Sequence, residues 1–454
     1  MVYFAHAVGA SVLGIYFIFT AYFSIYELIA NSGLGSSAVK KISEGQDQDE
    51  FYSASVLLQF ILLLVSIGVL FTIKNFQVVP EQGDLFLWLS IGLIVNFPFI
   101  IFWTGNYGLG KVGIIQFSKL LDYISKTIIQ IIAIFFGFQF AGLAGGFVFG
   151  IGVSTLINFR YIELHFRKFT VFHLKSLFNF FFWHFLTISG IIVITSTDVL
   201  IIGYFLSTAD VGIYRIAFQL VLLGLTVTYA MQSVLFPRFS RWSKEGNNGL
   251  ISTGLARAYT YSLSLAIPYC VGGWLTGDLV LEYVFGTEFR SGAVALFILL
   301  PALVVAIFSI LQVTTLNALD RPKYSFYVTA VAVGVNVLLS VVFIRFFGIN
   351  GAAVATLIAL IILSIGSYLA LRKFIMVRAE RNPVFNIITA TALMALFIAV
   401  FRIFLPTINL PLLICIIAGG AVIYVITLLK TDRGIHDEIK GMIVTMGLKW
   451  PGWL

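Results

Sequence analysis

The 454-residue chain is 60% hydrophobic and only 11% charged, and its mean hydropathy is +1.02. Soluble domains carry about 25% charged residues, so this chain cannot cover a water-exposed surface and must place most side chains against lipid or one another. Apolar stretches of about 20 residues recur from end to end, and each is long enough to span a bilayer as a helix. The formal net charge of +8 therefore indicates membrane topology rather than nucleic-acid binding.

The continuous apolar runs predict an all-α, polytopic membrane helix bundle. They lack the period-2 alternation of a membrane barrel, and an open sheet would leave backbone groups unpaired in lipid. About thirteen transmembrane helices are predicted. They cover residues 9–31, 53–73, 84–104, 116–138, 142–160, 180–206, 210–236, 253–275, 292–318, 324–346, 350–371, 384–405 and 410–429.

Basic residues gather in alternate connections, and this pattern predicts the topology. Most of the 28 lysines and arginines fall in longer connections on one side and in the tail from Lys430. The opposite connections, at 139–142, 207–209 and 347–350, are short and nearly uncharged. By the positive-inside rule, the basic side and the C-terminus are cytoplasmic. We expect the protein to lie in a plasma membrane.

An internal repeat relates the two halves of the chain. Residues 11–16 (SVLGIY) match 209–214 (ADVGIY), and each match opens a helix that a basic segment follows. Further along, 142–146 (GLAGG) resembles 348–352 (GINGA), and both lead from a tight turn into a small-residue helix. Two lobes of parallel repeat are a transporter architecture in which the substrate site lies between the lobes.

The repeat also shows a gap at the N-terminus. A full helix, 180–206, precedes Gly212, whereas only thirteen residues precede Gly14. We therefore expect that a first helix of about 20 residues is missing; the alternative is a thirteen-helix protein with a translocated N-terminus. The predicted organisation is two six-helix lobes, at 1–170 (lacking its first helix) and 171–375, two additional transmembrane helices in 376–430, and a cytoplasmic tail at 431–454.

Over nearly its whole length the chain resembles a Wzx-type oligosaccharide or polysaccharide flippase of the multidrug/oligosaccharidyl-lipid/polysaccharide exporter superfamily. The segments that carry this resemblance are 14–16 (GIY), 31–38 (NSGLGSSA), 198–205 (DVLIIGYF), 211–214 (VGIY), 285–289 (FGTEF), 321–323 (RPK), Asn336 and 348–356 (GINGAAVAT). Such flippases normally have about fourteen helices, so the expected loss of the first is a departure from the family pattern.

The resemblance implies transport of a polyprenyl-(di)phosphate-linked oligosaccharide from the cytoplasmic to the outer leaflet by alternating access. The expected partners are this lipid-linked glycan and the bilayer, with glycan polymerase or glycosyltransferase proteins as further candidates. No cofactor, metal site or enzymatic activity is expected, because the sequence has no phosphate-binding Gly-rich loop with Lys-Ser/Thr and no His/Glu zinc pattern. Two alternatives stay open, a cation-coupled drug or metabolite antiporter of the same superfamily and a polyprenyl-dependent membrane glycosyltransferase.

Charged residues within predicted helices are the candidate site residues, because intramembrane charge costs about 2.5–3.5 kcal/mol on insertion scales. Asp198 and Arg215 lie on neighbouring antiparallel helices. They either form a salt bridge that pins the hairpin, or Arg215 faces the cleft and binds the diphosphate while Asp198 holds it or takes up a proton. Asp122 and Lys126 are four residues apart, a spacing that favours a local ion pair. Lys126 as a cleft cation is the alternative.

The remaining candidates lie near helix ends or are uncharged. Arg257 is predicted to reach toward the cytoplasmic interface or to receive the substrate head group there. Glu27, near a cytoplasmic end, is a solvated residue or a coupling candidate. Asn336 is predicted to make an interhelical hydrogen bond, and Tyr16 and Tyr214 to belong to an interfacial aromatic belt rather than to stack on sugar rings.

Overall fold

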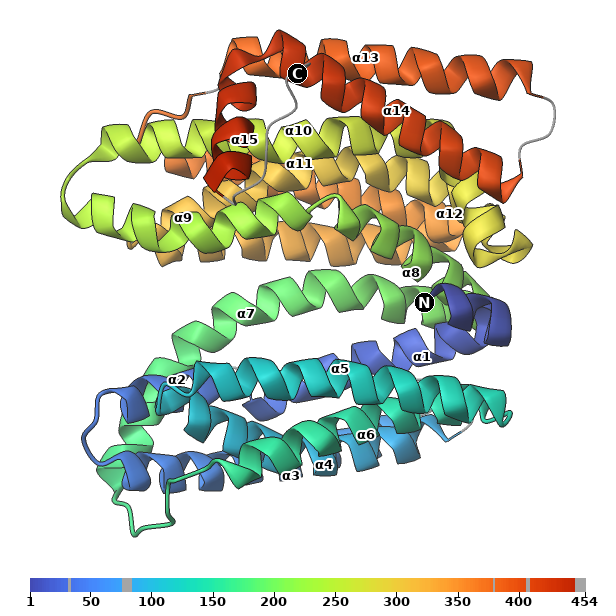
Figure 1. The fold of residues 1–454 in the computed structure, drawn as a ribbon. Coiled ribbons are helices and arrows are strands. Elements are labelled where there is room, and N and C mark those ends of the chain that lie inside the picture. The colour runs from blue at the N-terminus through green and yellow to red at the C-terminus, as the bar shows by residue number, and fades with distance from the viewer. Residues whose placement is uncertain (32–33, 76–83, 379, 406–408, 446–454) are drawn as a thin grey trace. The chain divides into compact units, whose positions relative to one another are not determined.

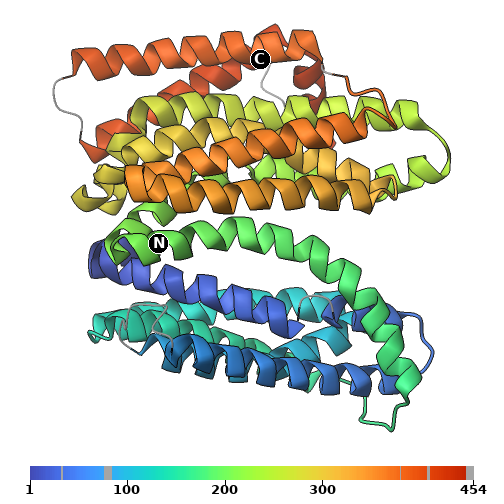
Figure 2. The same ribbon diagram turned by 180° about the vertical axis from the view of Figure 1, so that it is seen from behind.

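The computed structural model describes residues 1–31, 34–75, 84–378, 380–405 and 409–445, and the side chains of 30–31, 73–75, 179–195, 439 and 442–445 are outside this description. All regular structure in these ranges is helical, which confirms the all-α prediction. The chain divides into two compact units, unit 1 (Met1–Arg215) and unit 2 (Ile216–Leu454). Each is a bundle of long helices (Figures 1 and 2).

Unit 1 holds seven helices and the start of an eighth. They are α1 (Val2–Asn31), α2 (Leu34–Ser43), α3 (Gln48–Asn75), α4 (Leu85–Gly108), α5 (Val112–Phe135), α6 (Gln139–Arg160), α7 (Val171–Phe205) and α8 (Thr208–Leu223). Helix α7 packs against α1, α2 and α3, so the division falls within α8. The lobe boundary at 170/171 that the repeat suggests stays a prediction.

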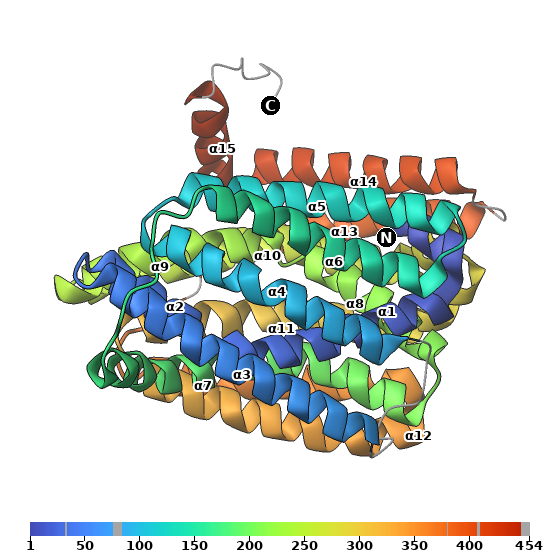
Figure 3. The ribbon, with the colours of Figure 1, turned by 90° about the horizontal axis from the view of Figure 1, so that it is seen from below.

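Unit 2 contains the rest of α8 and the C-terminal helices. They are α9 (Thr226–Lys244), α10 (Asn248–Val280), the π-helix η1 (Leu281–Phe285), the 3-10 helix η2 (Thr287–Gly292), α11 (Ala293–Ala318), α12 (Pro322–Leu371), α13 (Arg381–Phe404), α14 (Leu410–Thr431) and α15 (Arg433–Thr445). Helix α15 turns away from the direction of α14 (Figures 1 and 3).

Every predicted membrane span coincides with a helix, yet the count of thirteen is not confirmed. Among the described residues, nine helices are long and apolar enough to cross a membrane, or up to ten if the bent pair α8 and α9 forms one span. Part of the difference arises at Gly348 (φ 59°), because the spans predicted at 324–346 and 350–371 belong to the single 50-residue helix α12, which is broken at this glycine. Gly9 (φ 72°) breaks α1 near its start in the same way. Both φ values lie in the region that glycine adopts without steric cost.

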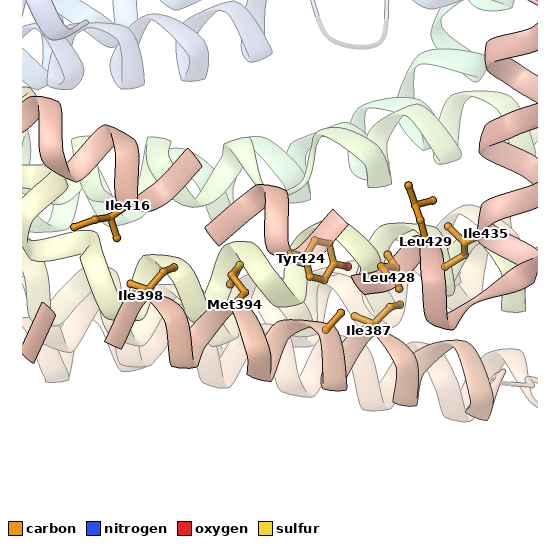
Figure 4. Close-up of a cluster of buried hydrophobic side chains, with 9 residues drawn as sticks. Ile387, Met394, Ile398, Ile416, Tyr424, Leu428, Leu429 and Ile435 are labelled. Atoms are coloured by element: carbon orange, nitrogen blue, oxygen red, sulfur yellow. The ribbon is translucent and has the colours of Figure 1, made fainter. Parts of the chain in front are cut away.

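Two amphipathic helices were not predicted as elements. Helix α2 buries Leu34, Ala38 and Ile42 in a cluster with α3 and α4. Helix α15 contributes Ile435 to a second cluster, which α13 and α14 form with side chains such as Met394 and Tyr424 (Figure 4). Both helices carry charged residues on the opposite face, so their sequences do not form apolar runs. Each is stabilised by burial of its apolar face.

Candidate functional site: polar groups buried in the helix bundles

Close packing of α6 on α5 positions the first group of candidate residues. Gly142, Gly146 and Gly150 recur every four residues on one face of α6, and a Cβ at any of them would meet α5. At Gly150 it would overlap the Asp122 carboxylate, and at Gly146 it would overlap Gln130. Small residues at this spacing allow membrane helices to approach closely, and this signal is present in the sequence (GLAGGFVFG).

Lys126 lies among aromatic rings. Its Nζ is 4.7 Å from the ring centroid of Tyr123 and 5.6 Å from that of Phe147. Phe147 in turn packs edge-on against Phe19, with ring centroids 5.5 Å apart. Cation–π contacts of this length stabilise an ammonium group that is removed from water.

Asp122 and Lys126 interact electrostatically along α5, as their spacing predicts, but they do not form a close ion pair. Among the described residues no salt bridge joins the two side chains within 4.0 Å, and Asp122 Oδ1 is buried without a hydrogen-bond partner. The i,i+4 spacing places both residues on one face of α5, but Phe147 of α6 takes the position next to the ammonium group. Asp122 is therefore a membrane-embedded carboxylate with unused acceptor capacity.

Tyr16 and Tyr214, equivalent residues of the repeat, are buried rather than interfacial. Gln130 Nε2 donates to Tyr16 Oη at 3.3 Å, and Tyr214 Oη donates to Asp198 Oδ2 at 3.1 Å. Each tyrosine therefore ends in a polar partner from another helix. The prediction of an aromatic belt at this position was wrong, because the repeat motif lies where helices α1 and α8 meet other helices.

Asp198, Tyr214 and Arg215 form the second group, where α7 meets α8. Asp198 is only 3% exposed, and it acts electrostatically on the partly buried guanidinium of Arg215. The structure therefore brings the acid and the base together, as the sequence suggests. Because Tyr214 donates to the same carboxylate, it holds the negative charge next to Arg215, a role that the sequence did not indicate.

The other candidates lie apart from these two groups. Asn96 of α4 hydrogen-bonds to the partly buried Glu27. Asn336 is fully buried in α12, and neither amide atom has a hydrogen-bond partner among the described residues, so the expected interhelical bond is not seen. Arg257 of α10 pairs with Glu438 of α15 at 3.5 Å. Arg257 belongs to unit 2, whereas Lys126 and Arg215 belong to unit 1.

A pocket of about 510 Å³ opens on unit 2 between α10, α11 and α13. Its walls are almost wholly apolar, and small side chains of α13 (Ala392, Ala395 and Ala399) make the space. At one end of these helices, Arg402 binds Asp278 through two hydrogen bonds of 3.0 and 2.8 Å and also donates to the Leu275 carbonyl. This contact fixes α13 against α10 beside the pocket.

The bundle of apolar helices with buried polar groups defines a multi-pass membrane protein with a transporter fold. The structure is similar to that of the lipid II flippase MurJ in an inward closed conformation, with a TM-score of 0.75 and 17% identity over 96% of this chain and 100% of that one. Residues 8–294 match the family described as polysaccharide biosynthesis protein. The chain belongs to this family, within the exporter superfamily that its motifs suggest.

Two relatives from Haloferax volcanii extend the similarity over most of the chain. One, a probable low-salt glycan biosynthesis flippase (Agl15), is 26% identical over 388 residues, which are 84% of this chain and 81% of the relative. The other, a probable flippase (AglR), is 24% identical over 451 residues, 97% of this chain and 94% of the relative. Similarity over nearly full lengths, rather than one segment, supports the family assignment.

Proposed function

We propose that the protein is a flippase that moves a polyprenyl-(di)phosphate-linked oligosaccharide from the cytoplasmic to the outer leaflet by alternating access. The main support is the family match together with relatives whose names denote flippases in glycan biosynthesis. Its task is transport rather than bond chemistry: a hydrated glycan and a phosphate group must cross about 30 Å of hydrocarbon.

Two cations among the helices fit a substrate of this charge. Arg215 and Lys126 are partly buried residues of helices in unit 1, and ionisable residues within membrane helices are costly and mark binding or transport roles. Arginine binds phosphate through two parallel hydrogen bonds, whereas lysine acts as a point charge. We assign Arg215 to the diphosphate, with Lys126 as a second cation along its path.

The apolar pocket of unit 2 fits the other half of the substrate. An isoprenoid chain is apolar and needs no polar partner, and the walls of this pocket offer almost none. Holding part of the prenyl chain there would keep the lipid attached to the transporter while its head group moves. An inside-negative potential would assist outward movement of a phosphate by about 2.3 kcal/mol per charge per 100 mV.

Topology and partners follow from the same proposal. The ends of the helices that carry the basic segments face the cytoplasm, with the C-terminal tail on that side. The protein acts in a plasma membrane, where glycan polymerases or glycosyltransferases would handle the same lipid-linked glycan.

Complementation in cells that lack their own oligosaccharide flippase tests the proposal. We expect the chain to restore lipid-linked glycan at the outer surface. A triple variant, Asp198→Asn with Arg215→Gln and Arg257→Ala, removes both cations without leaving the Asp198 charge unpaired, and should insert normally and fail to restore it. Normal glycan export by the triple variant would refute the site assignment, whereas no export by the inserted wild-type chain with several glycans would refute the function.

A second candidate, a cation-coupled antiporter of the same superfamily, rests on Asp122. One oxygen of this partly buried carboxylate, Oδ1, is buried without a hydrogen-bond partner among the described residues, as expected of a residue that binds a proton or a metal cation in transit. Efflux of cationic drugs that depends on a sodium or proton gradient, and that Asp122→Asn abolishes, would favour this function.

A further inference from the structure

The C-terminal helix α15 is attached firmly at its first turn. The backbone N–H of Ile435 donates to Asp432 Oδ1 at 3.0 Å, so Asp432 caps the helix. Asn386 of α13 donates to the other oxygen of Asp432 at 3.1 Å, and Ile435 is buried in the cluster with Ile387 and Leu428 (Figure 4). The start of α15 is therefore fixed to the α13–α14 hairpin.

One turn further along, α15 is held by an ion pair. Glu438 Oε1 lies 3.5 Å from Arg257 Nη1, and the side chains are 37% and 59% exposed. Exposed ion pairs of this kind contribute about 0–1 kcal/mol. A single residue in extended conformation, Asp432 (φ −116°, ψ 99°), joins α14 to α15. At Glu438, α15 therefore contacts α10 through an ion pair that a competing anion can replace.

A phosphate group is a stronger partner for Arg257 than Glu438. The diphosphate of a lipid-linked glycan carries two negative charges, one on each phosphorus, against one for a carboxylate, and two non-bridging oxygens of a phosphorus can accept parallel hydrogen bonds from the planar guanidinium. Both partners would use the same exposed guanidinium face. Only one of them can occupy it in full, so binding of a phosphate and docking of the distal part of α15 compete.

We propose that Glu438 is a built-in competitor for the phosphate of the transported lipid, and that substrate binding at Arg257 releases the distal part of α15 while its first turn stays attached. This inference rests on the proposed function, because it takes Arg257 to be where the substrate phosphate first binds. In this proposal α15 has two effects. While docked, it raises the substrate concentration needed for transport, and its release on the cytoplasmic side follows the binding of a phosphate to Arg257.

Amide hydrogen exchange of α15 in the purified full chain tests the release directly. Geranylgeranyl diphosphate is the probe, with geranylgeraniol as the control that lacks phosphate. We expect the diphosphate to accelerate exchange at residues 436–441 and to leave the capped residue Ile435 protected. Glu438→Gln should exchange fast at 436–441 without a ligand. Unchanged exchange at saturating diphosphate, or slow exchange in Glu438→Gln, would overturn the proposal.

Asp437→Asn is the matched control, because Asp437 is the neighbouring acid and its side chain is 77% exposed and pairs with His436 rather than with α10. It should exchange like the wild type. In vesicles, Glu438→Gln should lower the half-saturating concentration of lipid-linked glycan about two- to fivefold at unchanged maximal rate, as loss of a weak competitor predicts. If wild-type protein moves no glycan while α15 still responds to the diphosphate, the proposed function fails and the competition stands.

Discussion

Gly14 of α1 and Gly212 of α8 are equivalent residues of the repeat, and each packs against the backbone that precedes the other. A Cβ at Gly14 would overlap the carbonyl of Thr208, and a Cβ at Gly212 would overlap the carbonyl of Ala10. Beside them, the hydroxyls of Ser11 and Thr208 share a hydrogen bond of 2.9 Å. Two glycines that define the repeat in the sequence are therefore residues that let α1 and the start of α8 approach closely within unit 1.

Alanine at either glycine should destabilise this contact. Neither backbone carbonyl can move aside easily, so Gly14→Ala or Gly212→Ala should cost about 1–3 kcal/mol, the usual range for overpacking. The thermal unfolding midpoint of the purified protein measures the effect. Gly68→Ala in α3 is the control, because nothing lies within 4 Å of the added Cβ. Equal unfolding midpoints for Gly14→Ala and Gly68→Ala would contradict the close approach.

Asp198 should be needed to keep Arg215 in the bundle. Asp198→Asn removes the negative charge beside a buried cation and should destabilise the protein by about 3–5 kcal/mol. Tyr214→Phe removes one hydrogen bond and should cost about 1 kcal/mol. Thermal unfolding and the yield of monodisperse protein measure both effects.

A neutral pair separates the two roles that the sequence leaves open for these residues. Asp198→Asn combined with Arg215→Gln should recover most of the stability, since no charge is left unpaired. If the pair only pins α7 to α8, this double variant transports glycan normally. If Arg215 binds the diphosphate, as we propose, it is stable and inactive.

The helices could be predicted from the sequence because the bilayer imposes a strong and local requirement. A span needs about 20 apolar residues, and this length alone located every predicted helix. The short amphipathic helices α2 and α15 do not span the bilayer, so they need no such apolar run and hydropathy does not locate them. Helix α15 carries Asp437, Glu438 and Lys440 beside Ile435, so the apolar runs end before it.

The partners of the candidate residues were harder to predict, because they come from other helices. The spacing of Asp122 and Lys126 indicates an ion pair within α5, yet Phe147 of α6 lies next to the ammonium group. The predicted topology likewise places Tyr214 at an interface, whereas Asp198 of α7 accepts a hydrogen bond from it inside the bundle. Both results depend on helix packing, for which the glycine spacing on α6 is the signal that the sequence contains.

Filling the apolar pocket of unit 2 should impair transport without unfolding the protein. Ala395→Trp places a large ring where Ala395 lines the pocket, and a prenyl chain could then no longer enter. We expect the half-saturating concentration of lipid-linked glycan to rise about tenfold, equivalent to about 1.4 kcal/mol of lost binding. Leu393→Trp on the exposed face of the same helix is the control. Equal transport by the two variants would exclude the pocket as the prenyl site.

The contact between Arg402 and Asp278 should stabilise α13 more than an ordinary surface ion pair does. Asp278 is only 15% exposed, and both of its oxygens accept hydrogen bonds from the Arg402 guanidinium. Charge-assisted bonds of this kind contribute about 1.5–3 kcal/mol each, so Arg402→Ala should lower the unfolding midpoint by several degrees.

Arg290 and Glu282 provide the comparison, because this pair has a similar length of 2.8 Å but a 57% exposed arginine. Arg290→Ala should change stability by less than about 1 kcal/mol. Exchanging the charges, Arg402→Asp with Asp278→Arg, should recover part of the loss, since the pair can re-form although the bond to the Leu275 carbonyl is lost. If Arg402→Ala unfolds at the same temperature as Arg290→Ala, the pair does not hold α13 to α10, and the pocket wall must be fixed by packing in the cluster around Met394 instead.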